Sequence, residues 1–141
     1  MAPPAMILGT KLVLTCDGAI LTLLRDDKPG IPFPGHWDLP GGGIDPGETP
    51  LECGLRELTE ETGLVLTAAR LSEGRLIDWP NRPGKAMWFF FGGLTAEEAV
   101  SARLGDEGQE LRMMPLAEFV AHPLTIPFLA GIVRESFGLR V

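Results

Sequence analysis

The sequence predicts an α/β fold in which helices pack against a sheet, and three observations lead to this prediction. Segments rich in Leu, Val, Ile and Thr alternate along the chain with segments that carry helix-capping signals. Apolar residues make up 45% of the chain and charged residues 22%, which is enough apolar surface for a folded core. The length of 141 residues corresponds to one domain, so we expect a single domain over residues 1–141.

Strands are expected on both sides of a central helix. Residues 11–24 are mostly apolar and are interrupted by Cys16-Asp17-Gly18, which predicts two strands or a bent hairpin. Residues 26–40 are rich in proline and predict a loop, with at most a short strand at residues 36–39. Further strands are expected at residues 66–76, 86–91 and 110–114.

The central helix is expected at residues 50–62. Thr49 and Glu52 form a capping box around Pro50, and Gly63 supplies the left-handed residue that ends a helix. At 100° per residue, the face toward the core consists of Leu51, Leu55, Leu58 and Thr62.

Three further helices are expected in the C-terminal half. Thr95 and Glu98 form a second capping box before a short helix at residues 99–104. Helices are also expected at residues 115–121 and 127–137. The last of these has an apolar stripe of Phe128, Leu129, Ile132, Val133 and Phe137.

The charge and cysteine content exclude several classes of protein. A net charge of −7 has the wrong sign for passive binding to a nucleic acid polymer or to an anionic membrane. No stretch approaches the roughly 18 apolar residues of a membrane span, and the N-terminal residues lack the pattern of a leader peptide. Cys16 and Cys53 form neither a CxxC motif nor a disulfide framework, so we expect a cytoplasmic protein.

Acidic residues crowd one side of the central helix. Glu57, Glu60 and Glu61 fall within an arc about 100° wide, where they repel one another. Arg56 is placed to pair with Glu52 and Glu60, which leaves at least one carboxylate without a cation. Two interpretations remain open at this point: a solvated acidic face, or oxygen ligands for a divalent cation such as Mg²⁺.

A glycine-rich loop at residues 40–48 directly precedes this helix. Gly41, Gly42 and Gly43 leave the backbone uncovered, so carbonyl groups can approach a metal ion and amide groups can approach a phosphate. A glycine triplet alone is more often a plain turn. Its position before an acidic helix favours a phosphate and metal site.

Together the loop and the helix resemble the signature of a known family. From Gly42 the chain runs through five residues to Glu48, through seven more to Arg56, and then reads RELTEETGL, which resembles the Nudix box without a departure. The resemblance implies a Nudix-type α/β/α sandwich with a mixed β-sheet between helices. It also implies Mg²⁺- or Mn²⁺-dependent hydrolysis of a nucleoside diphosphate linked to another group.

The resemblance assigns roles to individual residues. It implies that Glu57, Glu60 and Glu61 bind metal together with the carbonyl group of Gly41, that Arg56 orients Glu57, and that Glu48 is structural. Glu107, in the segment EGQ, resembles a further acidic position of MutT-type members and is expected to be an additional ligand or base, with Glu110 as the alternative. The sequence leaves open which carboxylate is the general base.

Several residues are candidates for contacts with the substrate. Arg25 ends an apolar strand that leads toward the loop, where its guanidinium group can clamp a phosphate. Among the aromatic residues, Trp79 and Phe89 are candidates for stacking on a base.

Thr125 stands where members that recognise oxidised guanine place an asparagine, and a hydroxyl group cannot replace an amide there. The backbone of Gly42 and Gly43 is expected to contact phosphate, whereas His36 is expected at the surface and Trp37 in packing.

The resemblance leaves more than one function open. The expected substrate is a small nucleotide, such as a nucleoside triphosphate, and the expected assembly is a monomer or homodimer. Pro80, sixteen residues after the box, instead resembles a mark of ADP-ribose pyrophosphatases and keeps nucleotide sugars open. A non-catalytic module that binds a nucleotide is also open, as is an unrelated α/β scaffold whose acidic helix is only solvated.

Overall fold

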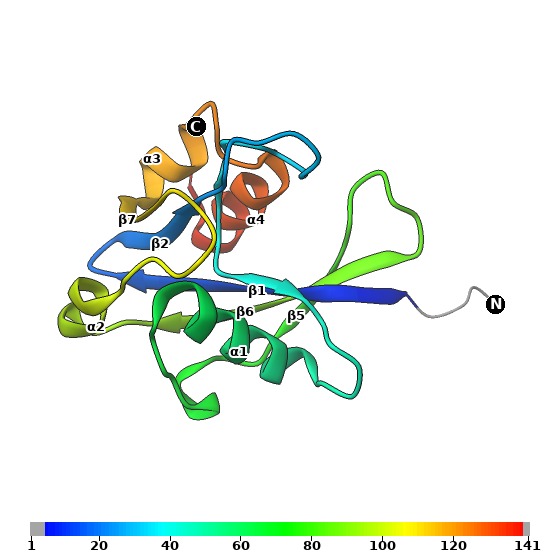
Figure 1. Cartoon of the computed structure of the whole chain (residues 1–141), viewed down its shortest axis with the longest axis horizontal. Coiled ribbons are helices and arrows are strands. Elements are labelled where there is room, and N and C mark those ends of the chain that lie inside the picture. The colour runs from blue at the N-terminus through cyan, green and yellow to red at the C-terminus, as the bar shows by residue number, and fades with distance from the viewer. Residues whose placement is uncertain (1–4, 140–141) are drawn as a thin grey trace.

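The computed structural model describes residues 5–139, and within these residues seven strands form one mixed sheet (Figure 1). The path through the sheet is β3-β2-β1-β6-β5, with β4 also paired to β1 and β7 to β2. The strands are β1 (Met6–Cys16), β2 (Ala19–Leu24), β3 (Trp37–Asp38), β4 (Gly41–Gly43), β5 (Arg75–Asp78), β6 (Lys85–Gly93) and β7 (Glu110–Pro115).

Strand β1 organises the sheet because it is paired along both edges. On one edge it runs parallel to β6, with Met6 opposite Lys85 and Thr15 opposite Gly93. On the other edge it pairs antiparallel with β4 and then with β2. The glycine segment expected as a loop is therefore a short strand, held against the middle of β1.

Helices cover both faces of this sheet. The helices are α1 (Pro50–Thr62), α2 (Ala96–Ser101), α3 (Leu116–Ala121) and α4 (Pro127–Phe137), with a 3₁₀ turn at Ala68–Arg70. Helix α1 lies on one side of the sheet, and α3 and α4 lie on the other (Figure 1). The arrangement confirms the α/β fold predicted from the residues, and it is the α/β/α sandwich with a mixed sheet that the family resemblance implies.

Alternating side chains of β1 divide the core into two layers. Leu12 and Leu14 point toward α1 and pack with Leu58, whereas Val13 points toward α4 and packs with Leu129. All five side chains are at most 1% exposed. This alternation also places Lys11, two residues before Val13, on the α4 face of the sheet.

The best-predicted elements carry strong local signals. The turn between β1 and β2 has left-handed residues at Asp17 and Gly18, where the sequence predicts a break. Helix α1 has the complete capping box of Thr49 and Glu52, and Gly63 ends it in the left-handed region. Helix α4 has the predicted bounds, and β6 and β7 contain the predicted strands.

Other expectations need correction. Residues 66–76 do not form one strand, because they contain the 3₁₀ turn and only the start of β5. Helix α2 begins at Ala96, directly after its capping residue, and not at residue 99. In α4, the apolar stripe differs from the predicted one. Phe137 is 39% exposed, whereas Ala130, which the prediction left out, is buried.

The core face of α1 is also rotated from the expected one. Cys53 and Gly54 are buried, whereas Leu51 and Leu55 are only partly buried. Gly54 is the reason, because a Cβ atom there would lie 2.9 Å from side-chain atoms of Thr10 and Leu12. The missing side chain lets the helix approach β1 closely.

Two further observations concern the cysteines and the lengths of the helices. Cys16 and Cys53 are both free thiols. Across the described part of the chain, the helices are too short or too polar to cross a bilayer.

We expect Gly9→Ala to destabilise the protein by about 1–3 kcal/mol, because its Cβ atom would lie 2.0 Å from the carbonyl oxygen of Gly42 and force β4 away from β1. The matched control is Gly131→Ala in α4, where nothing lies within 4 Å of the added Cβ and helix propensity favours alanine. Urea unfolding measures both variants. Equal midpoints for Gly9→Ala and the wild type would contradict the close packing of β4.

Candidate active site

Five carboxylates line one cavity at the C-terminal half of α1. The cavity has a volume of about 240 Å³ and is lined by Glu57, Glu60, Glu61, Asp106 and Glu107. We call it the carboxylate cavity. It brings the three predicted helix glutamates together with Glu107, which comes from a segment more than forty residues further along the chain.

Gly105 explains how that distant segment reaches α1. Its N–H group donates to the carbonyl oxygen of Glu61 over 3.0 Å. A Cβ atom at Gly105 would lie 2.1 Å from the carbonyl oxygen of Glu60, so only glycine permits this approach. The contact docks the segment on the end of the helix and places Asp106 and Glu107 beside the helix glutamates.

Glu61 is the most enclosed carboxylate of the helix triad. Its Oε1 atom accepts a hydrogen bond of 2.8 Å from the N–H group of Gly41. Burial raises the pKa of Glu61 to about 7, although the hydrogen bond from Gly41 and the charge of Lys11 act in the opposite direction. The carboxyl group therefore changes its charge near neutral pH in the metal-free protein.

Glu57 lies directly against the bare backbone of β4. A Cβ atom on Gly42 would come within 2.7 Å of the Glu57 carboxyl group, so a larger residue would displace the glutamate. Burial also raises the pKa of Glu57, against the lowering effect of Arg56. Two glycines of β4, Gly41 and Gly42, thus set the positions of two glutamates of the triad.

Arg56 holds the acidic cluster together. Its Nε atom donates to Glu48 over 2.6 Å, and its Nη1 atom lies 3.0 Å from Glu57 and 3.2 Å from Glu60. Its Nη2 atom donates to the carbonyl oxygen of Gly43 over 3.1 Å. The hydrogen bond from Arg56 lowers the pKa of Glu48 to about 2, so this ion pair persists in mild acid.

The expected pairing of Arg56 with Glu52 is wrong. Glu52 instead accepts from the backbone N–H group of Thr49 over 2.8 Å, as its place in the capping box requires. Glu48 takes its place as the partner of Arg56. The structural role that the family resemblance implies for Glu48 has this contact as a physical basis.

The donor set suits a hard divalent cation. All five side chains of the carboxylate cavity offer oxygen atoms, and Mg²⁺ and Mn²⁺ prefer such ligands. Within residues 5–139, no three His, Cys, Asp or Glu side chains converge closely enough to hold a metal as they stand. Glu57 and Glu60 are turned to Arg56 and Glu61 to Gly41, so metal binding requires these side chains to change partners.

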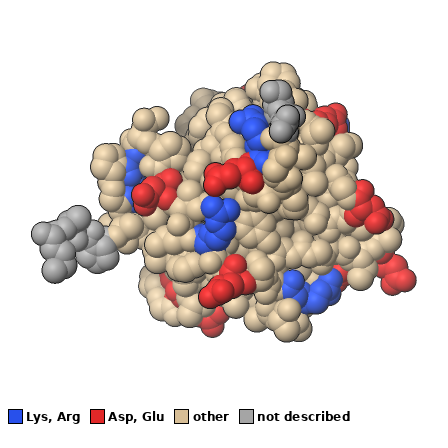
Figure 2. Space-filling view, turned by 180° about the vertical axis from the view of Figure 1, so that it is seen from behind, with Lys and Arg blue, Asp and Glu red and all other residues tan. Residues whose placement is uncertain are grey.

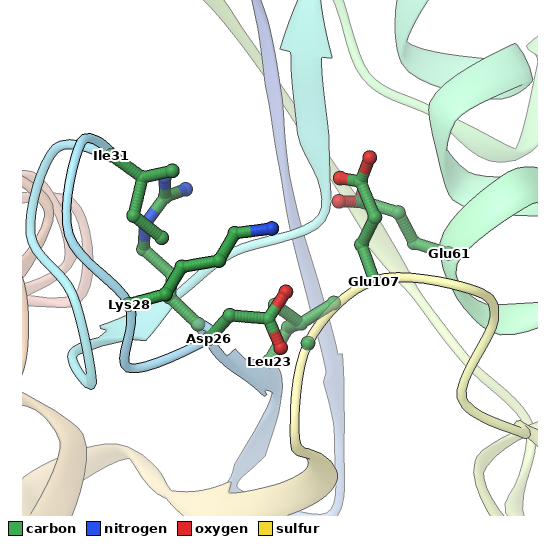
Figure 3. Close-up of a pocket in the computed structure, with 8 residues that line it drawn as sticks. Leu23, Asp26, Lys28, Ile31, Glu61 and Glu107 are labelled. Carbon is green, nitrogen blue, oxygen red and sulfur yellow. The ribbon is translucent and has the colours of Figure 1, made fainter.

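A second cavity of about 140 Å³ adjoins the first and shares Glu61 and Glu107 with it. Figure 3 shows the ammonium group of Lys28 projecting toward these two carboxylates from the loop after β2. Arg25, Asp26 and Ile31 also line this cavity. The sequence did not point to Asp26 or Lys28, because they lie in a proline-rich loop without a motif.

A third cavity of about 550 Å³ has a mixed apolar and charged lining, and we call it the nucleoside-sized cavity. It contains the predicted contact residues Arg25, Gly42, Gly43 and Trp79, and Arg25 is common to the second and third cavities. Its remaining lining residues are Leu8, Lys11, Pro32, Phe33, Asp38, Arg82, Met87, Ile126 and Leu129.

Three other candidates lie outside these cavities. Phe89 is fully buried and packs edge-to-face on Phe128, so it is a core residue and its ring is not open to a base. Thr125 is 3% exposed and forms an isolated parallel β-bridge with Trp37. Its hydroxyl group has no hydrogen-bond partner within the described part of the chain. Glu110 pairs with Arg112 on β7 and does not line the carboxylate cavity.

Comparison with known proteins identifies the family. The chain matches the model of the NUDIX domain over residues 10–135, so it belongs to the Nudix family. A protein of Erythrobacter litoralis named RNA pyrophosphohydrolase is 46% identical over 135 aligned residues, which cover 84% of this chain and 79% of that protein. A Haemophilus influenzae protein named 8-oxo-dGTP diphosphatase is 38% identical over 81 residues, covering 57% of this chain and 56% of that protein.

The fold is similar to solved structures as well. The MutT protein of Methanosarcina mazei has a TM-score of 0.71 at 19% identity, with 96% of this chain and 95% of that chain covered. The family and the named relatives together make this chain a hydrolase that acts on phosphorus acid anhydrides.

We expect the stability of the metal-free protein to fall as pH rises from about 5 to 8. The pKa of Glu61 is raised to about 7 from an ordinary 4.5, so its ionisation is less favourable in the folded state than in the unfolded state. The stabilising effect of the proton is complete below the ordinary value and is lost as pH passes through 7. Glu61→Gln should reduce this dependence in urea unfolding with EDTA, with a remainder from the raised pKa of Glu57. Glu97→Gln, on exposed α2, should leave it unchanged. Parallel curves for wild type and Glu61→Gln would refute the assignment.

Proposed function

We propose that this protein hydrolyses the P–O–P bond of a nucleoside triphosphate, or of another small molecule linked through a nucleoside diphosphate, with Mg²⁺ or Mn²⁺. The observation that carries the proposal is the carboxylate cavity of a Nudix-family protein. The second cavity, which shares Glu61 and Glu107 with it and Arg25 with the nucleoside-sized cavity, links the two. The free cysteines are consistent with action in the cytoplasm.

The proposed metal site uses residues from α1 and the loop before β7. Glu57, Glu60, Glu61 and Glu107, with the carbonyl group of Gly41, would hold the cation. A divalent cation held there would neutralise the diphosphate and lower the pKa of a water, and so would supply a nucleophile at neutral pH. Arg56 keeps Glu57 and Glu60 near each other before the cation arrives, through hydrogen bonds from one Nη1 atom to both.

The proposed substrate path runs past Arg25. Its guanidinium group lines the cavity beside Glu61 and Glu107 and also the nucleoside-sized cavity, so it is placed between the phosphates and the nucleoside. The backbone of Gly42 and Gly43 contacts the same substrate, and Trp79 offers an aromatic face for the base.

A second candidate function is hydrolysis at the 5′-triphosphate end of an RNA. The relative named RNA pyrophosphohydrolase, which aligns with most of this chain, favours it. The net charge of −7 favours a small nucleotide over a long polyanion. On the one face that Figure 2 shows, Lys and Arg side chains are scattered among Asp and Glu. A long RNA needs a continuous basic track, whereas a mononucleotide needs only the cavities.

The two remaining functions would each leave a distinct signature. An ADP-ribose or nucleotide-sugar pyrophosphatase would release two monophosphates from its substrate. A non-catalytic nucleotide-binding module would bind a nucleotide tightly without forming any product. The intact set of helix carboxylates favours catalysis over binding alone, because a binding module gains nothing from three crowded glutamates.

We expect Glu60→Gln to lose most turnover, by about 100-fold or more, because the amide cannot supply the negative charge that a divalent cation requires. Its fold should persist, since an amide oxygen still accepts from Arg56. Glu97→Gln on α2 serves as the control with the same chemical change at an exposed position. Activity of Glu60→Gln within threefold of the wild type would show that the metal site lies elsewhere.

The identity of the substrate can be found by chromatography of reaction products. Nucleoside triphosphates, ADP-ribose, dinucleoside polyphosphates, nucleotide sugars and a 5′-triphosphorylated RNA are each incubated with the protein and Mg²⁺. We expect a mononucleotide product and pyrophosphate from a nucleoside triphosphate, with no turnover in EDTA. Product from the RNA alone would favour the second candidate, and no product from any substrate would overturn the proposed hydrolysis.

A further inference from the structure

The nucleoside-sized cavity has a buried charged pair in its wall, which also contains Arg25, Arg82 and several apolar side chains. Lys11 of β1 and Asp38 of β3 both line it, and the Lys11 Nζ atom lies 3.0 Å from the Asp38 carboxylate. Their side chains are only 11% and 4% exposed. The two residues are 27 positions apart in sequence, and they meet because the chain that follows β3 runs alongside β1, where Gly41 lies opposite Lys11.

Packing alone does not account for this pair. Lys11 lies on the sheet face where Val13 and Met87 belong to the apolar core. Removing two charges from water is costly, and a well-packed apolar pair at such a position is often equally or more stable. Because both side chains border a cavity, the pair is placed to meet a bound molecule.

Hydrogen bonds within the protein occupy nearly all acceptor positions of Asp38, but they leave some donors of the neighbouring cations unused. The Asp38 carboxylate accepts from Lys11 and from Arg25 Nη1 at 3.0 Å, and from the Leu39 N–H group at 2.7 Å. A carboxylate has about four acceptor positions, so this one is nearly saturated.

Lys11 and Arg25 both retain donors. Lys11 uses one N–H for Asp38 and one for the Leu39 carbonyl oxygen at 3.3 Å, and an ammonium group has three. The Arg25 Nη2 atom takes part in none of the hydrogen bonds of the described residues, since Nε donates to Pro32 and Nη1 to Asp38. With Arg82, the cavity lining therefore carries three cations and one anion, and Lys11 and Arg25 keep unused donors that a ligand can accept from.

The remaining walls suit a flat, uncharged ring. Met87, Ile126 and Leu129 are buried apolar residues of the core, and Trp79 adds an aromatic face. A phosphate group placed against these apolar side chains would lose its hydration without gaining a cation there, which is costly. The phosphates instead have the neighbouring cavity, where Lys28 and Arg25 are the cations.

We propose that Lys11, held in place by Asp38, is a specificity-determining residue that donates a hydrogen bond to a keto oxygen on the base of the substrate. The inference rests on the proposed function and deepens it: the substrate class is a guanine or uracil nucleotide. The exocyclic amino group of adenine or cytosine would meet a donor at that position, and an unpaired buried polar group is strongly disfavoured.

The test compares kcat/KM for GTP and UTP with that for ATP and CTP, in Mg²⁺. The wild type should favour the keto nucleotides by at least about tenfold, the effect of one buried hydrogen bond to a charged group. Lys11→Met should reduce this preference to within about threefold, through loss of GTP and UTP activity. Asp38 keeps Arg25 as a partner in that variant, and melting temperature checks the fold.

Lys11→Gln is the second variant and covers the case in which Lys11→Met fails to fold. Its amide oxygen can accept from an amino group, so kcat/KM for ATP and CTP should rise relative to GTP and UTP. A wild type without keto preference would overturn the proposal. An equal loss on all four nucleotides in either folded variant would also overturn it, since that result indicates a contact with phosphate or a purely structural role.

Binding separates this inference from the proposed hydrolysis. Calorimetry with GMP, UMP, AMP and CMP reports base preference without turnover. A keto preference that Lys11→Met abolishes supports the role of Lys11 even if no substrate is hydrolysed. Equal binding of all four monophosphates by the wild type contradicts the role of Lys11 whatever the activity.

Discussion

The close contact between the glycine strand β4 and helix α1 is the constraint on which the site depends. Gly41 donates its N–H group to Glu61, and Gly42 leaves the space in which the Glu57 carboxyl group fits. Strand β4 can take this position because β1 also offers glycine, at Gly9, opposite Gly43. A side chain at Gly9, Gly41 or Gly42 would separate the sheet from the helix glutamates.

The second requirement is the control of negative charge before a cation binds. Several carboxylates share one cavity, and their mutual repulsion destabilises the helix unless a cation compensates it. Arg56 provides it by contacting Glu48, Glu57 and Glu60 at once. Burial keeps a proton on Glu61 up to about neutral pH by raising its pKa, which removes a further charge. The acidic site is thus compatible with a stable fold, and we propose that the same groups exchange these partners for a metal.

Local signals made part of this structure predictable. The capping box and Gly63 predicted the bounds of helix α1, and the spacing of its glutamates predicted which residues of that helix line the carboxylate cavity. Three features depend on long-range contacts and escaped prediction: the strand character of Gly41–Gly43, the pair of Lys11 with Asp38, and the docking of Gly105 on α1. Trp79 and Phe89 could not be distinguished in sequence, because only the register of β6 buries the second in the core.

The central claim is that the carboxylates of α1 bind a divalent cation against a diphosphate. Anomalous scattering from crystals grown with Mn²⁺ and a non-hydrolysable nucleotide tests it most directly. The account predicts a manganese peak among Glu57, Glu60 and Glu61, within bonding distance of the nucleotide phosphates, with Arg56 still bound to Glu48. Nucleotide in the cavity with no manganese peak beside α1 would contradict it.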